Sequence, residues 1–386
     1  MKILLLAGDY PAVGHQSLVF VQQLVHAMVD FGVQVTVVAP QSIIHSLVHK
    51  QKLLPRKTIA NTESGVEYVI YRPVVLSFGN IGMLRPISDW YNRRTISHKV
   101  ASLKYDVIYS HFWSSAMYIY KYAYEYNIPL FVACGEGDNA LEDMMLSMNI
   151  NNRNKLSSSV TGVISVSSEN KRKCIDYGLA NEDKIIVLPN CVNTEFFHKA
   201  DAADVKHRLC IRDNDFVIAF VGGFIPRKGP DRIAKALKML NDPEIKVMFI
   251  GKPFPGYPYE FDCPGIIHKG PIDHDLLPEY LNCASVFVMP TQNEGCCNAI
   301  VEALAIGLPV ISSNGPFNDD ILDENNSIRI NPDSVEEIAS AIKFLKDNLS
   351  LRMQMSEYSL SHHSQYSIKE RAKRIYDFIL QKANLI

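Results

Sequence analysis

The chain has 386 residues, which is enough for two domains of ordinary size. Its 39 Lys and Arg residues against 41 Asp and Glu residues give a formal net charge of −2, which does not support a general nucleic-acid-binding role. Hydrophobic residues at 47% and charged residues at 21% are typical of a folded globular protein rather than a disordered one.

The cysteines and the apolar segments indicate the compartment. The eight cysteines are scattered, with no C-x-x-C pair and no zinc-ligand spacing, which favours buried thiols in a reducing compartment. The apolar run near the N-terminus is too short for a signal peptide, and no stretch is long enough to span a membrane. We therefore expect a cytoplasmic protein that is at most peripheral on the inner face of a membrane.

Apolar strands alternate with helical patterns along most of the chain, in two series. The strands expected in the first series are 3–7, 35–40, 68–73, 106–111, 129–135, 161–167 and 184–190. Those of the second series are 216–223, 246–251, 285–291 and 308–313. Such strands between helices indicate parallel sheets covered on both faces. Because the charged segment 198–215 separates the two series, the sequence predicts an α/β protein of two doubly wound, Rossmann-like domains, 1–197 and 198–364, followed by a helix over about 365–386.

Polar residues follow several strands of the first half. The loop that contains Gly14 leads into a helix, so its backbone N–H groups could bind an anion, or it could be a plain tight turn. His111 ends a strand, at the edge where open parallel sheets bind ligands, and could contact a substrate hydroxyl or phosphate or merely cap the strand. Glu136 and Asp138 follow the next strand, where they could orient a sugar or an acceptor, or cap the following helix.

Arg227 and Lys228 precede a helix in the second half. Two cations beside a helix N-terminus suit a diphosphate, although a solvated surface pair is the plainer interpretation.

The segment 290–313 contains the most informative spacing. Glu294 lies in the loop after a strand, and Glu302 follows after seven intervening residues, in the first turns of a helix. Asn298, Ala299 and Ile300 would present backbone N–H groups to a phosphate at the start of that helix. Glu302 has apolar neighbours and is placed to accept both hydroxyls of a ribose, or it is simply an acid favoured by the helix dipole.

Two further patterns are weaker. The D-x-D triplets at 213–215 and 273–275 lie in a polar turn and at a helix start, and we expect neither to bind a catalytic metal. The basic stretch 49–57 and the pair Arg93–Arg94 near Trp90 have apolar neighbours, and they could meet an anionic membrane surface or form a solvated face.

Taken together, these residues resemble glycosyltransferase family 4, the group 1 type of retaining glycosyltransferases with the GT-B fold. The two glutamates, with the following A-L-A-I-G-L-P-V-I-S-S, are the most specific part. The R-K-G loop, His111 and the segment 187–197 support the resemblance independently. The resemblance implies two domains facing a cleft, with the nucleotide sugar on the C-terminal domain and the acceptor on the N-terminal one. It also implies a C-terminal helix that packs back on the N-terminal domain, and neither a metal nor another cofactor.

The chain departs from the family pattern at several positions. Gly223 stands where the family often has an arginine, a charge that Arg227 could supply. Cys296 and Cys297 follow Gly295 where G-F-G is usual, and Cys191 and Asn193 replace the glycine and aspartate of N-G-V-D. Both glutamates and Lys228 remain.

The resemblance also implies roles for the candidate residues. A hexose or N-acetylhexosamine would pass with retention from a UDP- or GDP-sugar to a hydroxyl of a glycan or lipid-linked acceptor, in cell-surface polysaccharide or glycolipid assembly. Arg227 and Lys228 would stabilise the leaving diphosphate. Glu302 would bind the ribose, Glu294 the sugar hydroxyls, and His111 the region of the sugar 6-hydroxyl or the reacting face, while the loop at Gly14 would approach the phosphate.

Two other functions stay open at this point. A non-hydrolysing nucleotide-sugar epimerase uses the same fold, although the R-K-G loop and the paired glutamates speak against it. A two-domain solute-binding protein would share the hinge and the cleft but would need export.

Overall fold

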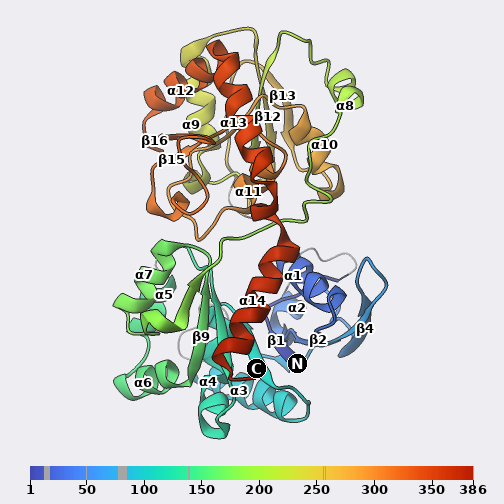
Figure 1. Ribbon diagram of the computed structural model, residues 1–386, viewed down its shortest axis with the longest axis vertical. Helices are drawn as coiled ribbons and strands as arrows, with labels where there is room; N and C mark the ends of the chain where they lie inside the picture. The colour runs from blue at the N-terminus through green and yellow to red at the C-terminus, as the bar shows by residue number, and fades with distance from the viewer. Residues whose placement is uncertain are drawn as a thin grey trace. The chain divides into compact units, whose positions relative to one another are not determined.

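The computed structural model describes residues 1–12, 18–48, 50–76, 85–137, 140–254, 256 and 258–385, so Gly14 and Asp138 lie outside the described residues. The chain forms two compact units, an N-terminal unit of Met1–Leu188 with Lys369–Ile386 and a C-terminal unit of Pro189–Ile368 (Figure 1). The first unit ends before the boundary expected after residue 197. The reason is that Val192 pairs with Ser367, and Phe197 is fully buried in the core of the C-terminal unit.

An eight-stranded sheet forms the centre of the N-terminal unit, in the order β10-β9-β8-β7-β1-β2-β5-β4. Every pair is parallel except β4 with β5. The strands are β1 (Lys2–Leu6), β2 (Gln34–Val38), β4 (Lys57–Asn61), β5 (Glu67–Tyr71), β7 (Val107–His111), β8 (Leu130–Cys134), β9 (Val160–Ser165) and β10 (Ile185–Val187). A separate pair joins β3 (Gln41–Ser42) to β6 (Val74–Val75). Because β7 and β8 are buried at every position, they read as continuous apolar runs in the sequence.

Helices surround this sheet, and side chains cap several of them. Ser167 and Asn149, for example, each accept a hydrogen bond from a backbone N–H in the first turn of the helix that follows. The helices are α1 (Val19–Asp30), α2 (Ile43–Val48), α3 (Arg85–Ala101), α4 (Trp113–Tyr126), α5 (Ala140–Leu146), α6 (Ile150–Ser159), α7 (Ser168–Asp176) and α14 (Ile368–Lys382). Among the described residues, no helix combines the length and the apolar character that crossing a bilayer requires.

The C-terminal unit is built on a six-stranded, fully parallel sheet, in the order β13-β12-β11-β14-β15-β16. Its strands are β11 (Phe216–Val221), β12 (Ile245–Ile250), β13 (Ile266–Gly270), β14 (Val286–Met289), β15 (Val310–Ser313) and β16 (Ser327–Ile330). Its helices are α8 (Ala203–Arg208), α9 (Pro230–Leu240), α10 (Leu277–Asn282), α11 (Asn298–Ala305), α12 (Val335–Asp347) and α13 (Leu349–Ser361). Two doubly wound sheets, one mostly and one fully parallel, confirm the predicted fold class. The two edge strands β13 and β16 were not expected, because β13 is only partly buried and the apolar run of β16 is interrupted by Arg329.

Each sheet reverses its winding direction beside one central strand. The chain moves outward from β1 on one side and from β7 on the other, and β11 and β14 have the same relation in the C-terminal unit. Ligands of such sheets bind beyond the carboxyl ends of the strands at this reversal. These ends are His111 and the loops that follow β1, β11 and β14.

The last helix, α14, belongs to the N-terminal unit (Figure 1). The buried Arg371 guanidinium donates to the carbonyl of Leu188 at 3.2 and 3.3 Å. The Phe378 ring meets Phe131 of β8 at 6.1 Å between centroids, and both rings occupy space that a Cβ at Gly162 would need. Packing of a buried side-chain face against the sheet therefore attaches the helix to this unit.

We expect Ile375→Ala to destabilise the N-terminal unit by roughly 2–4 kcal/mol, because Ile375 is fully buried on α14 and truncation removes apolar contacts and leaves a cavity. Denaturant unfolding followed by fluorescence measures the change. Ile150→Ala is the matched control, because Ile150 is 67% exposed and should change stability by less than about 0.5 kcal/mol. Equal effects of the two substitutions would contradict the docking of α14.

Candidate functional site

Two loops meet at the carboxyl edge of the C-terminal sheet, after β11 and after β14. The Arg232 side chain on α9, 9% exposed, joins them, because its guanidinium donates to the carbonyls of Pro226 and Pro290, each at 2.7 Å. The backbone of Gln292 also donates to the carbonyl of Arg227 at 2.9 Å. Gly229 has a φ of 74°, and a Cβ there would lie 2.5 Å from the Arg232 guanidinium. These hydrogen bonds therefore fix the position of the two loops relative to each other, and this arrangement requires glycine at position 229.

Arg227 and Lys228 converge on Glu294 in this arrangement. Arg227 Nη1 lies 3.1 Å from Glu294 Oε1, the Lys228 ammonium contacts the same oxygen, and Thr291 donates to it at 2.8 Å. The side chains of Glu294 and Lys228 are only 12% and 16% exposed. Burial alone would lower the pKa of Lys228, but the neighbouring Cys297 and Glu294 raise it above its ordinary value. Lys228 is therefore charged at neutral pH, and the plain surface-pair interpretation does not describe it.

Helix α11 begins at Asn298, as the sequence predicts. The N–H groups of Ile300 and Val301 donate to the carbonyl of Cys297 at 3.1 and 3.3 Å. Of the three N–H groups expected to face a phosphate, that of Ile300 is therefore used within the helix, whereas those of Asn298 and Ala299 have no backbone acceptor among the described residues. The Asn298 side chain in turn accepts a hydrogen bond from Asn190 at 2.8 Å.

Glu302 lies one turn further along α11 and pairs with His274. Its carboxylate is 3.8 Å from His274 Nε2, and the His274 ring stacks on Phe196 and meets Phe197 edge-on, at centroid distances of 5.8 and 5.7 Å. Contact with Glu302 raises the pKa of His274, against the opposing effect of burial. Glu302 is thus held by a side chain of the second D-x-D triplet.

His111 ends β7 in the N-terminal unit, with only 6% of its surface exposed. Its ring packs against Phe20 and Phe112 at 5.3 and 4.4 Å between centroids, and among the described residues neither ring nitrogen has a hydrogen-bond partner. Burial, together with the charge of Arg371, lowers its pKa to about 3. His111 is therefore a neutral imidazole with unused hydrogen-bonding capacity at a ligand-binding edge.

Glu136 has a structural task that the sequence did not reveal. Phe112, which precedes α4, has φ 72° and ψ 154° and provides no side-chain cap. Glu136 replaces that cap, because its carboxylate accepts hydrogen bonds from the N–H groups of Trp113 at 2.6 Å and Gly135 at 3.1 Å. Burial raises the pKa of Glu136 to about 7 against these hydrogen bonds. The residue caps α4, which precedes it, rather than the following helix, so the expected acceptor contact of this carboxylate competes with a cap.

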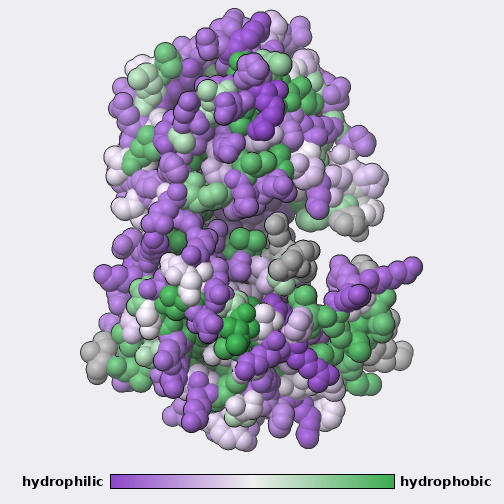
Figure 2. All heavy atoms as spheres, turned by 90° about the vertical axis from the view of Figure 1, so that its right-hand side faces the viewer, coloured by the Kyte–Doolittle hydropathy of each residue, from purple (hydrophilic) through white to green (hydrophobic). Residues whose placement is uncertain are grey.

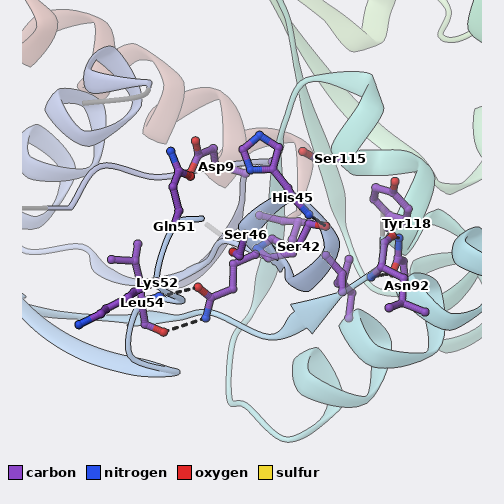
Figure 3. Close-up of a pocket in the computed structure, with 18 residues that line it drawn as sticks. Asp9, Ser42, His45, Ser46, Gln51, Lys52, Leu54, Asn92, Ser115 and Tyr118 are labelled. Atoms are coloured by element: carbon purple, nitrogen blue, oxygen red, sulfur yellow. Dashed lines mark hydrogen bonds between the residues drawn. The ribbon is translucent and has the colours of Figure 1, made fainter. Parts of the chain in front are cut away.

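A cavity of about 690 Å³ lies in the N-terminal unit, at the carboxyl ends of β1 and β2 (Figure 3). Asp9, His45 and Gln51 lie on one side of it, and Asn92 and Tyr118 on the other. Its lining comes from separate segments that converge only on folding, so the sequence did not indicate it.

No group of three or more His, Cys, Asp and Glu side chains among the described residues is arranged to hold a metal ion. In the first D-x-D triplet, Asp215 pairs with Arg212 at 2.8 Å. Metal independence of the reaction stays a prediction.

Sequence reasoning missed several residues of the site, namely Asn190, Arg232, His274 and Thr291. Arg232 has a signal in hindsight, since it is a charged residue among the buried residues of α9. Asn190, Arg232 and His274 each have a partner on a distant segment, whereas Thr291 contacts the nearby Glu294.

Comparisons with known proteins match both units. A family model described as glycosyl transferases group 1 matches residues 201–362, and one described as glycosyltransferase family 4 matches residues 18–196. The chain is also similar to solved structures that cover nearly all of it. Sucrose-phosphate synthase from Thermosynechococcus elongatus has a TM-score of 0.78 at 15% identity and covers 100% of both chains. Anabaena HepE in complex with UDP has a TM-score of 0.72 at 15% identity, covering 99% of this chain and 100% of that one. At this identity the likeness shows the fold, which is GT-B.

Three relatives have a higher sequence identity to the chain than these solved structures have. The UDP-Gal:alpha-D-GlcNAc-diphosphoundecaprenol alpha-1,3-galactosyltransferase of Escherichia coli is 26% identical over 57% of this chain and 60% of its own length. The capsular polysaccharide biosynthesis glycosyltransferase CapM of Staphylococcus aureus is 27% identical over 50% of this chain and 54% of its own length. The D-inositol 3-phosphate glycosyltransferase of Acidothermus cellulolyticus is 23% identical over 89% of this chain and 80% of its own length. The chain thus matches less than two thirds of the length of the first and second of these.

The burial of His111 predicts an acid sensitivity. Its folded-state pKa of about 3 lies below the ordinary 6.5, so as the pH falls below 6.5 the unfolded state takes up a proton that the folded state does not, and stability is lost. Roughly two pH units below 6.5, the wild type should have lost about 2–3 kcal/mol of stability through His111, and His111→Gln should not show this loss. Denaturant unfolding at neutral pH and at the lower pH measures the difference. The same substitution at the exposed His98 serves as control, and an unchanged pH dependence in His111→Gln would contradict the neutral buried imidazole.

Proposed function

Because the chain belongs to the group 1 glycosyltransferases of GT-B fold, we propose that it transfers a hexose or N-acetylhexosamine from a UDP- or GDP-sugar to an acceptor hydroxyl, with retention of the anomeric configuration. The convergence of Arg227 and Lys228 on Glu294, at the winding reversal of the C-terminal sheet, carries this proposal. A diphosphate ligand needs cations there, and a sugar hydroxyl needs a fixed carboxylate. The comparisons lend no support to the epimerase or the solute-binding alternative.

The donor side of the proposal uses the C-terminal unit. Lys228 and Arg227 bind the diphosphate and stabilise the charge that grows on it as the glycosidic bond breaks. The N–H groups of Asn298 and Ala299 at the start of α11 add an anion-binding helix terminus. Glu302 accepts the ribose hydroxyls, with His274 fixing its orientation at 3.8 Å. Glu294 holds the cations with Oε1 and accepts the sugar hydroxyls with its other oxygen, Oε2.

His111 contributes from the N-terminal unit as a neutral hydrogen-bonding group. A buried polar atom without a partner costs free energy, and a substrate hydroxyl that supplies the missing hydrogen bond regains it. This supports the sugar, near its 6-hydroxyl or the reacting face, as the partner of His111. Since its pKa is about 3, His111 does not act as a cation near neutral pH.

The reaction itself needs no covalent nucleophile in this proposal. The acceptor hydroxyl attacks the anomeric carbon on the face that the diphosphate leaves, and its proton passes to the departing phosphate oxygen. The acceptor is a glycan or a lipid-linked molecule in cell-surface polysaccharide or glycolipid assembly, which the names of the Escherichia coli and Staphylococcus aureus relatives support. We place the reaction in the cytoplasm, at the inner face of a membrane, and propose that it is independent of metal.

A panel of UDP- and GDP-sugars tests the proposal directly. Release of free nucleotide, faster with an acceptor than without and unchanged by EDTA, is the expected result. Conversion to a new nucleotide sugar without nucleotide release would identify an epimerase, and a loss of activity on chelation that manganese restores would refute metal independence.

We expect Lys228→Ala to weaken donor binding and turnover together, by about 2–4 kcal/mol in transition-state terms, because the variant loses a buried cation aimed at the leaving group. The ratio kcat/KM for donor consumption measures it. Lys235→Ala on the same helix-loop segment is the matched control, since its side chain is 63% exposed. A near-wild-type kcat/KM in Lys228→Ala would mean that Lys228 only pairs with Glu294 and does not act on the donor.

The two glutamates should behave differently. Glu302→Ala should weaken the binding of free nucleoside diphosphate as much as that of the whole donor, by roughly 1.5–3 kcal/mol, because a charged hydrogen-bond partner of the ribose is lost. Glu294→Ala should leave nucleoside diphosphate binding nearly intact but lower turnover and blur discrimination among donor sugars. Calorimetric titration beside the donor panel measures both, and equal loss of nucleotide affinity in the two variants would refute this division.

A further inference from the structure

The backbone directly after His111 is strained. Phe112 has φ 72° and ψ 154°, a combination that few residues other than glycine adopt. Its N–H still donates to the carbonyl of Ala133 at 3.1 Å, and its carbonyl accepts a hydrogen bond from the Ser110 hydroxyl at 3.2 Å. Helix α4 then begins at Trp113 without a cap from the preceding side chain. Such a conformation persists only where neighbouring groups enforce it, so the contacts of Phe112 and Trp113 fix the backbone that carries the His111 ring.

The loop after β8 contacts both of these residues. Glu136 accepts the Trp113 N–H with one carboxylate oxygen at 2.6 Å and the Gly135 N–H with the other at 3.1 Å. The Phe112 ring lies against Gly135, where a Cβ would be 3.0 Å from the nearest ring carbon. The loop therefore holds the two residues that follow His111 at two points, one by a charged hydrogen bond and one by close packing.

Glu136 is itself held from α7. Its backbone carbonyl accepts a hydrogen bond from the Asn170 side-chain amide at 3.1 Å. The backbone N–H of Asn170 donates to the hydroxyl of Ser167, which caps α7, at 3.2 Å. Asn170 and Ser167 are each only 1% exposed. The carboxylate is thus supported by a buried helix start, which is the kind of support that a residue needs in order to orient another group.

The orientation of the His111 ring depends on this arrangement. Hydrophilic side chains cover much of the molecular face shown in Figure 2, whereas the polar His111 ring is buried. Among the described residues neither ring nitrogen has a hydrogen-bond partner, so the ring is oriented by packing. Its neighbours are Phe112 at 4.4 Å and Phe20 at 5.3 Å between centroids. Because Phe20 also packs on Phe112, at 6.5 Å, a displacement of Phe112 would displace the imidazole as well.

We propose that Glu136 is a positioning residue, whose carboxylate fixes, through Trp113 and Phe112, the orientation in which the His111 imidazole meets the donor sugar. The proposal rests on the transferase function proposed above, in which His111 contacts the sugar. Both oxygens of Glu136 accept backbone N–H groups. Glu136 therefore acts through His111 and not by direct contact with an acceptor.

The kinetics of Glu136→Gln and Gly135→Ala test this role. Burial raises the pKa of Glu136 to about 7, so the assay runs at about pH 8, where the carboxylate is mostly ionised. Glutamine keeps the volume, but its one amide oxygen cannot replace two carboxylate oxygens. For acceptor-free hydrolysis of the most active UDP- or GDP-sugar of the panel, kcat should fall by about tenfold or more, since a misplacement of about 1 Å can cost roughly 100-fold. The donor KM should stay near the wild-type value. Gly135→Ala displaces Phe112 sterically and should have the same effect.

A second background shows whether Glu136 acts through His111. In His111→Ala, the further substitution Glu136→Gln should leave kcat nearly unchanged, because two residues that act through one contact are not additive. A purely structural cap would lower kcat by the same factor in both backgrounds, and that result would overturn the proposal.

Asn149→Ala is the matched control. Asn149 caps α6 in the same unit by accepting the N–H of Asn152 at 2.9 Å, so this variant also loses a helix cap, but away from His111. Its kcat should match that of the wild type. An equal fall of kcat in Asn149→Ala and Glu136→Gln would mean that any lost cap in this unit has the same effect, which would overturn the positioning role.

Histidine NMR tests the positioning without any transferase activity. The ring signal of His111 is the one that His111→Gln removes. Since the imidazole lies between two aromatic rings, this signal should shift in Glu136→Gln and Gly135→Ala but not in Asn149→Ala. Failure of hydrolysis in the wild type would count against the transferase function alone, and an unchanged His111 signal in Glu136→Gln would overturn the positioning role alone.

Discussion

One buried guanidinium sets the geometry of the donor side. Arg232 holds the loops after β11 and β14 together by donating to a carbonyl of each. Losing either carbonyl would leave a terminal nitrogen of a buried charge without its acceptor, so this contact is expensive to break and fixes both loops. Arg227, Lys228 and Glu294 lie on those loops, and their convergence follows from it. Gly229 is part of the same constraint, because any side chain there would collide with the guanidinium.

The N-terminal unit differs at its own winding reversal, which contains a buried polar side chain and a strained backbone conformation. His111 is buried without a hydrogen-bond partner among the described residues, and Phe112 has a backbone conformation that costs about 1–3 kcal/mol outside glycine. Glu136 caps α4 from another loop because Phe112 cannot. Strain and unsatisfied polar atoms persist only where the surroundings enforce them, and here they gather at the edge where a ligand of this sheet binds.

The sequence was sufficient for the fold class and for placing the candidate residues on strand ends, loops and one helix start. Periodic apolar runs reveal buried parallel strands, and the carboxyl ends of such strands share one edge of the sheet. The same reasoning could not find Arg232, His274 or the cap at Glu136, because each acts through a partner on a distant segment. It also placed the unit boundary too late, since only the structure shows Val192 pairing with Ser367 and Phe197 buried with the C-terminal unit.

The cations of the proposed donor side are partly neutralised by a carboxylate without substrate, and this decides how a diphosphate would bind. Arg227, Lys228 and Glu294 together leave one net positive charge, and Glu302 lies 3.8 Å from His274 Nε2, whose pKa this contact raises. A nucleoside diphosphate therefore meets a weakly positive, already ordered cluster rather than two isolated buried cations, which would be costly to keep in the empty protein. In the proposed reaction, diphosphate binding would exchange part of the lysine–glutamate contact for lysine–phosphate contact, so that both oxygens of Glu294 could accept sugar hydroxyls. The carboxylate that stabilises the two cations without substrate would thus serve the sugar once the diphosphate takes over their charge.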